Sequence, residues 1–127
     1  MKRIKSMEEI NADIVLLDSE DKQIIEEIVK YEEEIFHEGA IGIWNIKPFI
    51  KYGKVYALVS LEARLISAIE IMKDFEEHKA YIYGFFTKES FRNKGYGDMF
   101  LKNILEELHN IYGINKIELT VSQENRN

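Results

Sequence analysis

The chain has 127 residues, 46% of them apolar and 12% aromatic, which suits the core of one domain and excludes a disordered chain. A formal net charge of −6 argues against nucleic acid and anionic membranes as partners. Without cysteine there can be no disulfide, no zinc–thiolate site and no cysteine nucleophile. No apolar run approaches the ~20 residues that a membrane-spanning helix needs. The basic N-terminal residues are not followed by the apolar segment of a secretory signal peptide. We therefore expect one cytoplasmic domain over residues 1–127.

The first half of the chain predicts one strand and two helices. The apolar run 14–17 is typical of a strand. From Lys22 to Phe36 the apolar residues fall three or four apart, which predicts an amphipathic helix. A shorter helix is expected over Trp44–Tyr52, although it contains Pro48. Its aromatic residues are expected in the core, with a place in the wall of a binding site as the alternative.

In the second half of the chain, the spacing of the apolar residues first changes from that of a helix to that of a strand. Residues 54–61 and 65–72 are rich in aliphatic and β-branched residues and predict a hairpin, followed by a third aromatic-rich strand over 80–87. Residues 97–112 carry a helical apolar stripe that ends at Gly113, and residues 116–121 alternate like a strand. The order predicts an α/β (α+β) domain with a mixed, mostly antiparallel sheet flanked by helices.

The segment Thr87–Gly97, T-K-E-S-F-R-N-K-G-Y-G, joins a strand directly to a helix. Backbone N–H groups at a helix start lack internal partners and lie at the positive end of the helix dipole. Gly95 and Gly97 allow close approach of a ligand, and Arg92 and Lys94 add positive charge. The segment therefore predicts a phosphate-binding turn, although it matches neither the Walker nor the dinucleotide motif.

The spacing Arg-x-x-Gly-x-Gly, formed by Arg92, Gly95 and Gly97, resembles the pyrophosphate loop of the GNAT superfamily of N-acetyltransferases. The predicted order of elements resembles that family's fold over nearly the whole chain. The resemblance implies an enzyme that moves acetyl from acetyl-CoA to a primary amine, on a small molecule or a protein, by direct transfer. Acetyl-CoA would be the co-substrate, and no metal is implied.

The resemblance also implies the coenzyme-binding residues. Backbone of the fourth strand of the family, which falls here on Phe85, Phe86 and Thr87, would bind the pantetheine arm and supply oxyanion donors. The pyrophosphate would lie on the loop, whose residues are Arg92, Asn93, Lys94, Gly95, Tyr96 and Gly97. Asn125 matches an asparagine that follows the family's fifth strand and is a further candidate contact.

The printed sequence ends at Asn127, before the point where the family continues with a helix that usually bears an acidic tyrosine and with two more strands. An uncovered fifth strand would be an exposed edge, so a second copy pairing along that edge is one expectation. The alternative function is a non-catalytic CoA-binding or assembly module that lacks this helix.

Candidates for the catalytic base are few. Many members of the family use a glutamate on the fourth strand, but Tyr83 falls at the corresponding place. Glu70 on the preceding strand and Glu118 on the last strand are the carboxylate candidates. The plainer interpretation of each glutamate is a solvent-exposed position on a strand. The plainer interpretation of Tyr83 is a half-buried aromatic side chain.

Residues 20–38 hold eight acidic residues and two lysines. In the family this region shapes the acceptor side, so an acidic flank could favour a cationic amine. The plainer interpretation is the solvated face of a helix. The three histidines lack metal-ligand spacing, so no metal site is expected.

Overall fold

The computed structural model describes residues 1–74 and 78–119, and these form a six-stranded sheet. The strands lie in chain order, and each pairs antiparallel with the next except the last two, which are parallel. The strands are β1 (Lys2–Met7), β2 (Ala12–Leu16), β3 (Lys54–Ser60), β4 (Leu65–Asp74), β5 (Lys79–Thr87) and β6 (Lys116–Leu119). The predicted mixed, mostly antiparallel sheet is confirmed.

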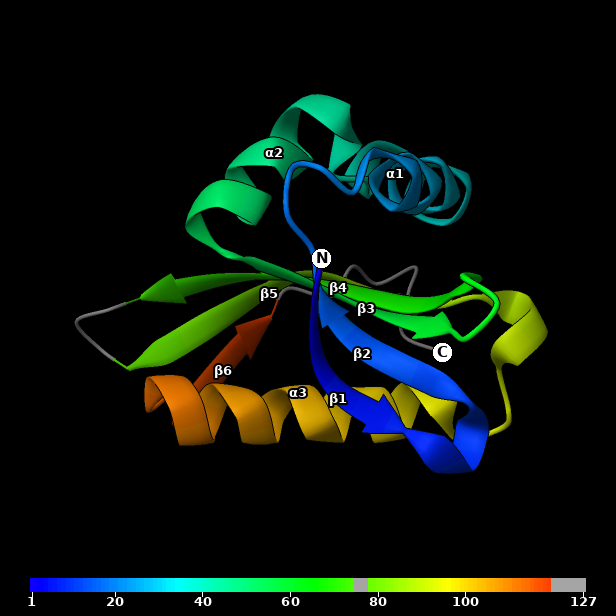
Figure 1. Cartoon of the computed structure of the whole chain (residues 1–127). Coiled ribbons are helices and arrows are strands. Elements are labelled where there is room, and N and C mark those ends of the chain that lie inside the picture. The colour runs from blue at the N-terminus through cyan, green and yellow to red at the C-terminus, as the bar shows by residue number, and fades with distance from the viewer. Residues whose placement is uncertain (75–77, 120–127) are drawn as a thin grey trace.

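Helices cover both faces of the sheet (Figure 1). α1 (Lys22–Phe36) and α2 (Gly42–Tyr52) lie on one face, and α3 (Tyr96–Tyr112) lies on the other. Each face has its own apolar core, one centred on Ile28 and Ile46 and the other on Phe100 and Ile104. None of the helices in the described part of the chain is long and apolar enough to cross a membrane.

The N-terminal hairpin is absent from the sequence prediction, which placed the first strand at 14–17. β1 pairs with β2 through the short helix η1 (Glu8–Ile10), and Asn11 makes the turn with a φ of 52°. β1 is mostly exposed and carries Lys2, Arg3 and Lys5, so its sequence lacks the apolar alternation that marks a half-buried strand. Such charged residues are typical of an edge strand that avoids pairing with other chains.

The second helix also differs from its prediction. It begins at Gly42 rather than Trp44 and contains Pro48. The expectation that its aromatic residues belong to the core is correct for Phe49, which packs against the α1/α2-side core. It is wrong for Trp44 and Tyr52, which are 79% and 66% exposed. Both rings instead lie near lysine ammonium groups on the outer side of the helix.

Candidate functional site

The loop between β5 and α3 leaves the start of α3 uncapped. Gly95 is the N-cap residue, adopts the left-handed conformation with a φ of 78°, and has no side chain to accept a hydrogen bond. In the described chain, the N–H groups of Tyr96, Gly97 and Asp98 find no backbone acceptor, whereas Met99 already donates to the Gly95 carbonyl. These three N–H groups lie at the positive end of a 17-residue helix, which is an arrangement suited to an anion.

Gly97 is required by packing against the end of β5. A Cβ at this position would lie 2.6 Å from Oγ1 of Thr87, too close for any side chain without a shift. Across the loop, Nε of Arg92 donates to the Thr87 carbonyl at 3.0 Å. Thr87 therefore fixes both ends of the loop, and the Asn93–Gly95 segment between them is exposed. Figure 1 shows this loop at the end of the sheet where β5 finishes.

The last residues of β5 offer backbone groups on the side away from β4. The Lys88 amide donates to the Ile66 carbonyl, and the Phe86 carbonyl accepts from the Ser67 hydroxyl, so both residues turn toward β4. Since alternate residues of a strand turn their polar groups to opposite neighbours, Phe85 and Thr87 turn theirs away from β4. The described pairing of β5 with β6 ends earlier, at Ile82 and Leu119.

A bulge interrupts the pairing of β4 with β5 just before these residues. Glu70 pairs with Gly84 and the next residue, Ile71, pairs with Ile82, so Tyr83 is the extra residue. A Cβ at Gly84 would lie 2.5 Å from Oε1 of Glu70 and 2.9 Å from Oε2 of Glu32. Two carboxyl groups, one from β4 and one from α1, thus occupy the space that a side chain at Gly84 would need.

Both carboxyl groups are buried. Glu32 is 1% exposed and Glu70 is 0% exposed, and all four of their oxygen atoms lack a hydrogen-bond partner in the described structure. Burial raises the pKa of Glu32 to about 7. Burial and the negative charge of Glu32 raise the pKa of Glu70 well above its usual range. The pair therefore holds a proton near neutral pH, because two adjacent buried carboxylates cannot both stay charged.

These findings change the sequence interpretation of both glutamates. A solvated strand position was the plainer interpretation of Glu70, and burial overturns it. Glu32 was counted only within the acidic run of the first helix, yet it lies on the buried stripe with Ile25, Ile28 and Val29. The spacing of Glu32 from Ile28 and Val29, four and three residues, is the signal that could have found it.

The other candidate catalytic residues lie in different settings. Tyr83 is 39% exposed, and its ring lies 5.3 Å from that of Phe49 on α2. Glu118 is exposed on β6 and forms an ion pair with Lys79 at 3.0 Å, so it does not join the buried pair. Asn125 lies outside the described residues.

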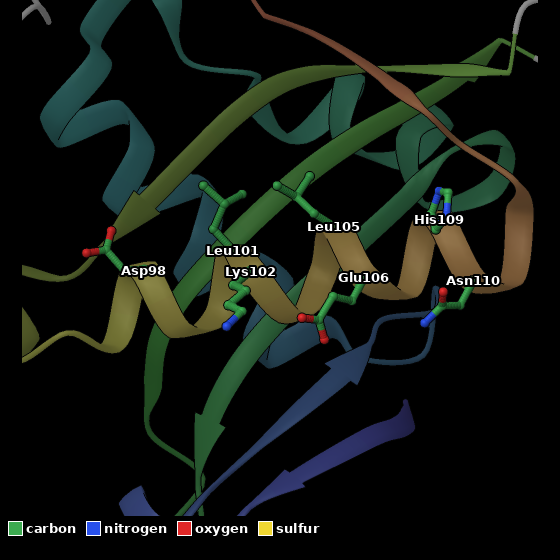
Figure 2. Close-up of a pocket in the computed structure, with 7 residues that line it drawn as sticks. All are labelled: Asp98, Leu101, Lys102, Leu105, Glu106, His109 and Asn110. Carbon is green, nitrogen blue, oxygen red and sulfur yellow. The ribbon is translucent and has the colours of Figure 1, made fainter.

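A separate surface hollow runs along α3, and Figure 2 shows its side chains on successive turns of the helix. It is lined by Asp98, Leu101, Lys102, Leu105, Glu106, His109 and Asn110. None of these residues belongs to the loop or to the carboxyl pair, although Asp98 lies in the uncapped first turn of α3. Among the described residues, no group of His, Asp and Glu side chains could hold a metal ion.

Comparisons with known proteins identify the family and the fold. The acetyltransferase (GNAT) family model matches residues 16–127. An IAA acetyltransferase from Bacillus cereus has a TM-score of 0.67 at 16% identity, covering 88% of this chain and 67% of that one. An aminoglycoside acetyltransferase from an uncultured soil metagenomic sample, in complex with sisomicin, has a TM-score of 0.70 at 14% identity, covering 91% and 81%.

A ribosomal-protein-alanine N-acetyltransferase from Brucella melitensis gives a TM-score of 0.69 at 10% identity, covering 88% of this chain and 81% of that one. A comparison with curated protein sequences finds no match. The fold is that of acyl-CoA N-acyltransferases. The chain belongs to the GNAT acetyltransferase family, as the resemblance of its loop predicts, and it is an acetyltransferase by family and fold.

Proposed function

We propose that this chain moves the acetyl group of acetyl-CoA directly to a primary amine. The observation that carries the proposal is the uncapped start of α3, where three N–H groups lack a backbone acceptor among the described residues and follow a left-handed glycine. Arg92 and Lys94 add positive charge beside these N–H groups. A diphosphate matches such a site in charge and in its need for several donors.

The coenzyme then extends from the loop along the end of β5. Its diphosphate binds the segment Arg92–Gly97, and its pantetheine arm lies beside Phe85, Phe86 and Thr87. This placement is supported by the backbone groups of Phe85 and Thr87, which turn away from β4. The Thr87 carbonyl already accepts from Arg92, so the N–H groups remain as the donors for the coenzyme carbonyls.

The reaction needs a neutral amine, a stabilised oxyanion and a leaving thiolate. The amine nitrogen attacks the thioester carbonyl carbon, and the N–H groups of Phe85 and Thr87 stabilise the negative oxygen. The carbon–sulfur bond then breaks, the thiolate takes up a proton to give free CoA, and the amine becomes an amide. Glu70 is the carboxylate we assign to proton removal, since its carboxyl group lies beside Gly84, next to the proposed thioester position.

The acceptor enters from the α1/α2 face, where Glu32, Glu70 and Tyr83 lie. A cationic amine suits this side, because the carboxyl groups there have no cationic partner in the described structure. Two structural neighbours are named for aminoglycosides and for ribosomal-protein alanine, both of which present amino groups. We place Tyr83 in the wall of this acceptor site.

We also propose that a second copy of the chain can cover the β6 edge. The apolar side chains of Ile117 and Leu119 are 36% and 55% exposed there. Sedimentation at micromolar concentration should then detect a dimer, and a monomer at all concentrations would contradict it. A cytoplasmic location and an independent single domain over 1–127 stay predictions.

Two measurements test the function. Acetyl-CoA and CoA should raise the melting temperature, whereas ATP and NAD should not. A panel of primary amines incubated with acetyl-CoA should then release free thiol above the rate without amine. CoA binding without thiol release on any amine would favour the alternative of a non-catalytic CoA-binding module, and the absence of CoA binding would overturn both.

A further inference from the structure

The buried carboxyl groups of Glu32 and Glu70 come from elements far apart in the sequence, α1 and β4, and meet only in the folded chain. The approach is close, because Oε1 of Glu70 and Oε2 of Glu32 both lie within 3 Å of a Cβ built on Gly84. An isolated buried carboxylate is costly, and a second one beside it raises that cost. Such a pair is stable only when at least one of the two carboxyl groups is protonated.

We propose that Glu32 is a positioning residue that makes Glu70 part of a single proton-accepting unit. The unit holds one proton and one negative charge and takes the proton of a cationic acceptor amine. This inference rests on the proposed acetyl transfer and deepens it. The acceptor enters as an ammonium ion, one of its N–H bonds breaks, an O–H bond forms on the pair, and the neutral amine remains to attack the thioester.

The position of the pair supports this role. Gly84 lies directly over the carboxyl groups and is followed by Phe85, whose backbone polar groups turn away from β4, the side on which we place the thioester. The bulge at Tyr83 removes one pairing to β4 at the same point. A purely structural core at this position would be filled with apolar side chains, as it is at the neighbouring residues Ala68 and Val55.

Several charged and titratable groups on the elements beside the pair have partners elsewhere. On α1, Tyr31 accepts from the Glu89 amide, and Glu27 pairs with Lys88 from the end of β5. On α2, Lys47 and Lys51 lie over the rings of Trp44 and Tyr52. On β5, Tyr83 packs against Phe49, and Tyr81 also has an interaction of its own. The charge that raises the pKa of Glu70 is that of Glu32.

The direct test is a carbon-13 NMR titration of the glutamate carboxyl groups in the full chain without coenzyme. Wild type should show two linked steps, one near pH 7 for Glu32 and one for Glu70 that also lies well above the ordinary glutamate range. Glu32→Gln should leave one step, with Glu70 titrating at a lower pH than in wild type. The control Glu33→Gln changes the next residue on the same helix, which is exposed, and should keep both steps.

Activity supplies a second readout. Glu32→Gln and Glu70→Gln should each lower kcat by about 100-fold with little change in CoA affinity, which is typical of a lost general base. The double variant should be no slower than either single variant, because residues that act as one unit are not additive. Glu33→Gln should keep wild-type kcat.

The outcomes separate the two proposals. If both carboxyl groups lose their protons below about pH 5, near their ordinary values, the shared proton is disproved even in an active enzyme. If the titration is as expected and Glu32→Gln keeps the wild-type kcat, the positioning role is disproved. If no amine is acetylated while the coupled titration is present, the proposed function fails, and with it the catalytic use of the pair.

Discussion

The carboxyl group of Glu32 on α1 meets that of Glu70 on β4 beneath Gly84, where β5 bulges. Both groups are buried and have no hydrogen-bond partner in the described structure. This relationship joins the α1/α2 face of the sheet, where we propose that the acceptor enters, to the strand end from which the proposed coenzyme loop begins.

Gly84→Ala should displace the carboxyl pair, because the new Cβ would lie 2.5 Å from Oε1 of Glu70. We expect a stability loss of about 1–3 kcal/mol from overpacking and a kcat reduced by at least about tenfold. CoA affinity should change little. The control is Gly39→Ala, whose nearest neighbour would be 3.9 Å away. Full activity in Gly84→Ala would show that the pair has no role in transfer.

Glu70→Gln should stabilise the protein at pH 8 and not at pH 4. The raised pKa values mean that the folded protein holds more protons than the unfolded chain between the ordinary glutamate range and about pH 7. Stability of the wild type therefore falls as pH rises through that window, and Gln at position 70 removes the part of the fall that Glu70 contributes. We expect a gain of about 2 kcal/mol at pH 8. Urea unfolding at both pH values measures it, and a loss of stability at pH 8 would contradict the sign.

Gly95→Glu should abolish CoA binding while the chain stays folded, since it places bulk and negative charge at the start of α3. Gly42→Glu is a matched control, because Gly42 has a φ of 77° against 78° for Gly95, and a Cβ at either position meets no atom within 4 Å. Both variants carry the same strain and charge. Calorimetric titration with CoA should show binding only in the control, and equal binding in both would remove the loop from the site.

Gly97→Ala should weaken CoA binding through its contact with Thr87. The added Cβ would lie 2.6 Å from Oγ1 of Thr87, so either the helix start or the strand end must shift. We expect about a tenfold loss of CoA affinity. Adding Thr87→Ala removes the obstructing hydroxyl and should restore most of that affinity. If the double variant binds no better than Gly97→Ala, the steric explanation is wrong.

The sequence predicts the turn that leads into α3 well, because its residues are adjacent in the chain. The motif is recognised from the spacing of Arg92, Gly95 and Gly97. The structure puts this segment at the start of a helix, as expected. The helix over 22–36 is confirmed for the same reason, since its period is local. The polar strand β1 is missed because its stability comes from pairing with β2 rather than from its own pattern.

The carboxyl pair could be predicted only in part. Glu32 lies three residues after Val29 and four after Ile28, which indicates the buried face, but its charge favours the solvated interpretation. Its partner Glu70 is 38 positions further along, and the bulge at Tyr83 that brings Gly84 over both depends on strand register. The bulge depends on how two separate strands pair, so it cannot be read from the residues of β5 alone.

The central claim is that the start of α3 binds the diphosphate of CoA. The most direct measurement is nitrogen-15 NMR of the amide groups during a titration with CoA. The account predicts that the signals of Tyr96, Gly97 and Asp98 move most and that their hydrogen exchange slows. The claim would be contradicted if these three signals did not change and the only shifts came from the other residues that line the surface hollow along α3 (Figure 2).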